Sequence, residues 1–142
     1  LVIDIAGEAS VLMTMQEMST AVQYKLPIKI FILNNQYMGM VRQWQELLHE
    51  KNYSESYTAA LPDFVKLAEA YGCVGIQATK PDELDEKINE MINTKEPVIF
   101  DCRVDPAENC FPMIPSGKPH NQMLLGPEDE KEEVSDEGKT LV

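Results

Sequence analysis

The chain has 142 residues, of which 44% are hydrophobic and 25% are charged, enough for about one soluble globular domain. Its 24 acidic and 12 basic residues leave a formal net charge of −12. An acidic surface repels phosphate backbones and anionic headgroups, so the composition disfavours a nucleic-acid-binding or membrane-surface protein. The sequence has no uncharged apolar run long enough to span a bilayer.

The first five residues, LVIDI, are mostly apolar and β-branched and predict a buried strand. Such a strand needs neighbours on both sides, so we expect the chain to be a piece of a longer protein. Gly7 ends this strand, and Ser10 is predicted to cap the helix that follows. The predicted strands are 1–5, 28–33, 73–77 and 97–104. The predicted helices are 11–24, 38–49, 62–71 and 81–92, so that strands and helices alternate except for the two successive helices after the second strand.

This order predicts an α/β fold, a parallel sheet with helices on both faces. Pro62 is expected in the first turn of its helix and Gly72 at the end of that helix. Residues 106–126 contain several prolines and predict an irregular arm. Residues 127–142 hold seven acidic and two basic residues and predict a disordered tail.

The three cysteines, Cys73, Cys102 and Cys110, have no disulfide or metal-site spacing and are interpreted as buried or half-buried thiols. His49 and His120 are too isolated in sequence to complete a metal cluster with them.

In an open parallel sheet, ligands bind beyond the carboxyl ends of the strands. Gly7-Glu8-Ala9-Ser10 follows the first strand and offers backbone N–H groups at a helix start, which suits a phosphate. Asn34-Asn35 follows the second strand and offers an amide oxygen. A carboxylate, an amide oxygen, a backbone carbonyl and phosphate oxygens make an octahedral Mg²⁺ site. Each segment alone is more typical of an ordinary helix start or turn, and it is the two together, at the ends of two strands, that favour the Mg²⁺ site.

The segments GEAS (7–10) and KIFILNN (29–35) resemble the thiamine-diphosphate motif, which begins Gly-Asp-Gly and ends Asn-Asn. Residues 12–48 and 108–123, with MGMVRQWQ and PMIPSG inside them, are similar to the catalytic subunit of the acetohydroxyacid synthase (acetolactate synthase) family. The resemblance covers residues 1 to about 126. It implies a thiamine-diphosphate-binding domain over 1–105, truncated at its N-terminus, with the arm 106–126 over the active site.

The resemblance also implies roles for particular residues. Mg²⁺ would be bound by the side chains of Glu8 and Asn35 and by the backbone carbonyl of Tyr37. The residues expected around the cofactor are Gly7, Glu8, Ala9, Ser10, Asn35, Tyr37, Met38, Gly39 and Met40. Those expected along the substrate channel are Met40, Val41, Trp44 and Ser116. Without the resemblance, Trp44 suits the core face of a helix equally well.

Glu8 departs from the family pattern, which has Asp at this position. The extra methylene carries the carboxylate roughly 1.5 Å further, and Mg²⁺ demands near-ideal geometry. We therefore expect weaker Mg²⁺ and cofactor binding than an Asp would give.

The implied reaction condenses two pyruvates to 2-acetolactate, or pyruvate with 2-ketobutyrate to 2-aceto-2-hydroxybutyrate, with loss of CO₂. It belongs to branched-chain amino-acid synthesis. The family also implies a homodimer or homotetramer of catalytic subunits, a possible regulatory subunit, and a cytoplasmic, plastid or mitochondrial location. FAD would be bound mainly by a domain not present in this chain.

The activating Glu of this family is expected on another missing domain, so the isolated chain is expected to be inactive. Two alternatives stay open. One is a thiamine-diphosphate decarboxylase or oxidase acting on another 2-ketoacid, and the other is a module that binds no cofactor and only pairs subunits.

Overall fold

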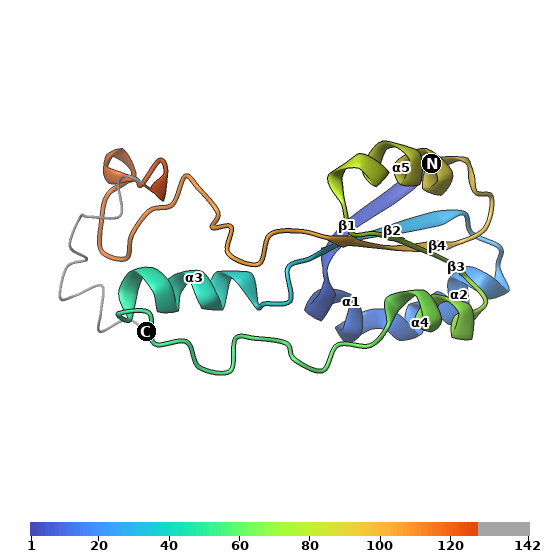
Figure 1. Ribbon diagram of the computed structural model, residues 1–142, viewed down its shortest axis with the longest axis horizontal. Helices are drawn as coiled ribbons and strands as arrows, with labels where there is room; N and C mark the ends of the chain where they lie inside the picture. The colour runs from blue at the N-terminus through green and yellow to red at the C-terminus, as the bar shows by residue number, and fades with distance from the viewer. Residues whose placement is uncertain (128–142) are drawn as a thin grey trace. The chain divides into compact units, whose positions relative to one another are not determined.

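A computed structural model describes residues 1–127 of the chain. Four parallel strands form one sheet in the order β1-β2-β4-β3 (Figure 1). The strands are β1 (Val2–Gly7), β2 (Ile28–Asn34), β3 (Val74–Ala78) and β4 (Val98–Arg103). The α-helices are α1 (Glu8–Thr14), α2 (Met18–Gln23), α3 (Gly39–Leu48), α4 (Phe64–Tyr71) and α5 (Leu84–Asn93). Short 3₁₀ turns are η1 (Met15–Glu17), η2 (Pro81–Glu83) and η3 (His120–Gln122). The predicted α/β fold with a parallel sheet is confirmed.

Helices cover both faces of the sheet, as the sequence predicted. Helices α1, α2 and α4 lie on one face and α5 on the other (Figure 1). The first core contains Val11, Met18 and Phe64 from the helices, packed with Ile32 and Ile99 from the strands. The second core joins Met91 of α5 to buried side chains of β3 and β4: Ile76, Ala78, Val98, Phe100 and Cys102. Neighbouring residues of β4 therefore point to opposite faces, as strand geometry requires.

The expectation that the first strand is buried is wrong for this chain. β1 pairs with β2 along one edge and is an outer strand of the sheet. Val2, Ile3 and Ile5 are all exposed. Their apolar, β-branched character favours a strand. Burial of these side chains would also require neighbours against the unpaired edge of β1, and no described residue pairs with that edge.

Three predicted local features differ in detail. The helix expected over 11–24 begins earlier, at Glu8, and a 3₁₀ turn divides it into α1 and α2. Gly7, not Ser10, occupies its N-cap position. Asp63 caps α4 by accepting a hydrogen bond from the Lys66 N–H (3.1 Å), so Pro62 precedes the helix. Gly72 ends α4 with φ +83°, as expected for a glycine C-cap.

The chain divides into two compact units. One contains residues 1–37 and 58–106, with the whole sheet, and the other contains, among the described residues, 38–57 and 107–127. In the second unit, Arg42 of α3 donates to Ala107 O and Asn109 Oδ1, and the Gln43 amide exchanges two hydrogen bonds with the Cys110 backbone. These contacts tie the arm to α3. The arm is irregular apart from η3 and one bridge between Met113 and Leu124.

Cys73 and Cys102 are buried, as expected, but Cys110 is exposed because it lies in the irregular arm. The acidic tail predicted over 127–142 lies outside the described residues from 128 onward. Among residues 1–127, no helix has the length and apolar character needed to cross a membrane.

A close approach of α4 to the backbone of β3 at Gly75 predicts a sharp stability effect. A Cβ added to Gly75 of β3 would lie 2.8 Å from Val65 Cα and O of α4. We expect Gly75→Ala to lower the free energy of unfolding by about 1–3 kcal/mol, because backbone must move. Gly126→Ala is the control, since nothing lies within 4 Å of its added Cβ. Thermal unfolding followed by circular dichroism measures both, and equal melting temperatures would contradict this account.

Candidate functional site

The predicted site residues lie where two neighbouring strands end. β1 and β2 pair in parallel, with Gly7 opposite Leu33, so their carboxyl ends adjoin at one edge of the sheet. Glu8 is the first residue of α1 and follows Gly7 directly, while Asn35 follows the last residue of β2. The structure therefore brings Glu8 and Asn35 together, although 26 residues separate them in the sequence.

The Glu8 side chain is buried, with 1% of the residue exposed. Its carboxylate receives hydrogen bonds from the N–H groups of Glu8 and Asn35 and a long one, 3.5 Å, from Thr58 Oγ1. Burial raises the pKa of Glu8, and these hydrogen bonds together with the charge of Arg103 oppose that rise. Because burial outweighs these partners, the acid is costly to ionise, as expected of a carboxylate suited to binding a cation.

Two consecutive asparagines shape the turn after β2. The Asn34 Oδ1 accepts from the Gln36 N–H, and the Asn35 Oδ1 accepts from the Tyr37 N–H, each at 3.2 Å. Gln36 has φ +61°, a left-handed conformation that is uncommon for a residue other than glycine. An amide oxygen has two lone pairs, so the half-buried Asn35 keeps one for a second partner.

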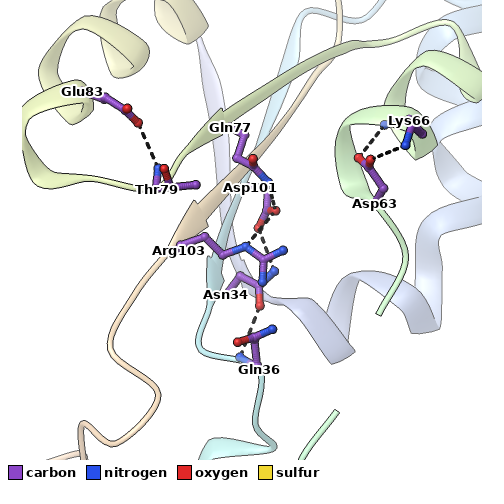
Figure 2. Close-up of polar contacts among 9 residues, drawn as sticks. All are labelled: Asn34, Gln36, Asp63, Lys66, Gln77, Thr79, Glu83, Asp101 and Arg103. Carbon is purple, nitrogen blue, oxygen red and sulfur yellow. Dashed lines mark hydrogen bonds and ion pairs between the residues drawn. The ribbon is translucent and has the colours of Figure 1, made fainter. Parts of the chain in front are cut away.

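Sequence reasoning missed a buried acid beside this turn. Asp101 of β4 is fully buried and accepts from Asn34 Nδ2 (2.8 Å) and Gln77 Nε2 (2.9 Å) (Figure 2). Arg103 Nε forms an ion pair with Asp101 Oδ2 at 3.3 Å. The available signal was a single acid inside the apolar strand segment VIFDC, because a charge on a central strand needs partners. Thr58, which donates to Glu8, was also missed, and nothing in the sequence around it indicates that contact.

The residues present fit a magnesium diphosphate. The carboxylate of Glu8, the amide of Asn35 and a carbonyl of the same turn are hard oxygen donors of the kind Mg²⁺ prefers. Gly7 has φ −83°, and an added Cβ would meet only Ser10 Oγ at 3.8 Å, so the fold itself does not require glycine there. A bare backbone leaves room for a ligand to approach.

A metal at this edge would rely on mixed donors rather than on a cluster of acids. Within residues 1–127, no three His, Cys, Asp or Glu side chains are grouped to hold a metal ion. Ala9 and Ser10 lie in the first turn of α1, where N–H groups have no partner within the helix. Their assignment to the diphosphate, like the metal ligand set, stays a prediction.

The predicted channel residues lie in the second unit. Met40, Val41 and Trp44 of α3 line an open, mostly apolar cleft of about 550 Å³, together with Gln45, His49 and Asn52. Met40 and Val41 are exposed, so Trp44 does not face a closed core. Ser116 lies half-buried in the arm and does not line this cleft. Met38 and Gly39 stand just before and at the start of α3.

Comparison of the sequence with models of known families identifies the family to which the chain belongs. The model for the thiamine pyrophosphate enzyme, C-terminal TPP binding domain, matches residues 1–102. The chain belongs to this family of thiamine-pyrophosphate-binding domains.

Particular relatives are acetolactate synthases. The chain is 50% identical over 125 residues to the acetolactate synthase large subunit of Cyanidium caldarium, covering 87% of this chain and 21% of the relative. It is 44% identical over 131 residues to that of Haemophilus influenzae, covering 92% of the chain and 23% of the relative. The mitochondrial catalytic subunit of Saccharomyces cerevisiae is 45% identical over 135 residues, 94% of the chain and 20% of the relative.

A solved structure agrees on the fold. The thiamine diphosphate-dependent 4-hydroxybenzoylformate decarboxylase of Rhodococcus jostii superposes with a TM-score of 0.67 at 27% identity, over 73% of this chain and 20% of that one. The chain thus spans about a fifth of the length of the proteins it matches.

The buried Glu8 predicts a pH-dependent cost in the metal-free protein. Folding raises the pKa of Glu8 above its ordinary 4.5, so the folded state holds the proton more tightly than the unfolded state does. The contribution of Glu8 to the free energy of unfolding then falls as pH rises from 4.5 and levels off above the folded pKa.

Glu8→Gln cannot ionise, so we expect it to match the wild type near about pH 4 and to be more stable at neutral pH. Urea denaturation in the presence of a chelator, repeated across this pH range, measures the difference. A difference that does not vary with pH would contradict the assigned cause.

Proposed function

We propose that this chain is the cofactor-anchoring part of an acetolactate synthase catalytic subunit. The subunit would condense two pyruvates to 2-acetolactate, or pyruvate with 2-ketobutyrate, with loss of CO₂. The observation that carries the proposal is the buried Glu8 carboxylate beside Asn35, at adjoining ends of two parallel strands. The identity of 44–50% to acetolactate synthases over most of the chain supports the choice of substrate.

In this proposal the chain holds and orients the cofactor. Glu8, Asn35 and the Tyr37 carbonyl bind Mg²⁺, and the backbone of Gly7, Ala9 and Ser10 receives the diphosphate. Bound thiamine diphosphate supplies an electron sink for decarboxylation of a 2-ketoacid. The open, mostly apolar cleft beside Trp44 receives the substrate's alkyl group.

The finer assignments follow from the same proposal. Met38, Gly39 and Met40 lie near the cofactor, and Ser116 and the arm contribute to the substrate channel. The full-length subunit also binds FAD through a domain outside this chain and assembles as a homodimer or homotetramer, with a possible regulatory subunit. The domain division at residues 105 and 126 is part of the proposal.

A second candidate is a thiamine-diphosphate decarboxylase of another 2-ketoacid. The observation in its favour is the similarity to the solved 4-hydroxybenzoylformate decarboxylase, at 27% identity. The two candidates share the anchor at Glu8 and Asn35 and differ in the substrate that enters the cleft. A module that binds no cofactor is the third, and only the glutamate at position 8 favours it.

The proposal predicts metal- and cofactor-dependent synthesis of acetolactate by the full-length protein. With pyruvate, Mg²⁺ and thiamine diphosphate, we expect 2-acetolactate as the main product, and we expect a chelator to abolish its formation. The isolated 142-residue chain is the control and should show no turnover. Acetaldehyde as the main product would favour the second candidate, and the absence of calorimetric cofactor binding would favour the third.

The glutamate predicts a metal affinity below the optimum. Glu8→Asp in the full-length protein should bind Mg²⁺ more tightly, by up to about tenfold, because the shorter acid suits the small ion. Titration of activity with Mg²⁺ at saturating thiamine diphosphate measures this, with Glu17→Asp on the exposed side of η1 as the control. An unchanged Mg²⁺ requirement would show that the extra methylene is accommodated without loss.

A further inference from the structure

We propose that Asn34 and Asp101 are positioning residues, which set the conformation of the turn that presents Asn35 to the metal. The inference rests on the proposed function, because it assigns Asn35 to a Mg²⁺ site. Neither residue touches the metal in this account. Asp101 acts through Asn34, and Asn34 acts through the backbone of Gln36.

The first step is the burial of a charge on the central strand β4. Asp101 is fully buried, and its two carboxylate oxygens accept hydrogen bonds from different neighbours. Oδ1 accepts from Asn34 Nδ2 on β2, while Oδ2 accepts from Gln77 Nε2 on β3 and forms an ion pair with Arg103 Nε (Figure 2). A buried carboxylate with this many donors is held in one orientation, because losing any donor leaves it under-solvated.

The second step is the orientation of the Asn34 amide. Its Nδ2 donates to Asp101 and its Oδ1 accepts from the Gln36 N–H. Rotating the amide by half a turn would point its oxygen at the carboxylate and its NH₂ at the Gln36 N–H, which is unfavourable at both ends. Asp101 therefore determines which Asn34 atom faces the turn, and Asn34 is 1% exposed, so water does not substitute.

The third step is the strained turn itself. Gln36 has φ +61°, and a conformation of this kind persists only where its surroundings hold it. The hydrogen bond from its N–H to Asn34 is one such restraint. Asn35 lies between these two residues, and the Asn34 carbonyl is also fixed by the Val104 N–H at 3.2 Å. The backbone on either side of Asn35 is thus held by contacts that begin at Asp101, and the Asn35 side chain, which accepts from the Tyr37 N–H, extends from that backbone.

Gln77 provides a matched control. Like Asn34, it is an amide side chain that donates to the Asp101 carboxylate, at almost the same distance. It differs in lying on β3, on the far side of β4 from the turn, and in being exposed where Asn34 is buried. A purely structural role for the cluster predicts that metal binding weakens when either donor to Asp101 is removed. A positioning role predicts that only Asn34 affects the metal.

The test uses the full-length protein with Asn34→Ala, Gln77→Ala and Asp101→Asn. Binding of Mn²⁺ in the presence of thiamine diphosphate is followed by electron paramagnetic resonance of the free ion, and thermal unfolding is measured without metal. We expect Asn34→Ala and Asp101→Asn to weaken Mn²⁺ binding by about tenfold or more. Gln77→Ala should leave it within about twofold, and it should lower the melting temperature less than Asn34→Ala does, because Gln77 is exposed.

The outcomes separate this inference from the function on which it rests. A wild-type protein that binds no Mn²⁺ with thiamine diphosphate overturns both. Wild-type binding that Asn34→Ala leaves unchanged, or that Gln77→Ala weakens equally, overturns the positioning role alone. If Asp101→Asn does not fold, Asn34→Ala against Gln77→Ala still decides the question.

Discussion

The parallel pairing of β1 with β2 is the constraint on which the site depends. It places Gly7 opposite Leu33, so the residues that follow the two strands leave the sheet at the same edge. A shift of one residue would turn every side chain of β1 to the other face. Neither Glu8 nor Asn35 has a long side chain with which to correct such an error. The backbone register therefore positions the proposed metal donors.

Two buried charges sit near opposite ends of this sheet, and the contrast between them is informative. Lys29, near the start of β2, donates from Nζ to the carbonyls of Thr94 and Glu96 at 2.7 Å, where α5 ends. It thereby joins a helix end to the strand, and burial lowers its pKa. Asp101 lies toward the carboxyl end of β4, and its partners lead to the turn after β2. One buried charge supports the scaffold, whereas the other adjoins the site.

The sequence predicted the element order and the parallel sheet because strong apolar runs and glycine or proline boundaries are local signals. It also placed Glu8 and Asn35 together, since parallel strand ends must meet. It failed where the outcome depends on tertiary neighbours. Exposure of Ile3 and Ile5 follows from the position of β1 in the sheet, and the contacts of Asp101 follow from strand order. Neither strand order nor register is encoded in a local pattern.

Glu8 shows why a functional residue can oppose the stability of the fold that carries it. Its carboxylate is buried at a strand end, and its raised pKa means that the folded domain holds the proton more tightly than the unfolded chain does. A metal ion requires the ionised form, so binding releases whatever proton the acid holds and converts an unfavourable buried charge into a ligand. Apolar packing of the same position would stabilise the domain and remove a ligand of the proposed Mg²⁺ site. In the proposed function, the stability that the domain loses by burying this acid therefore contributes to the binding free energy of the metal and cofactor.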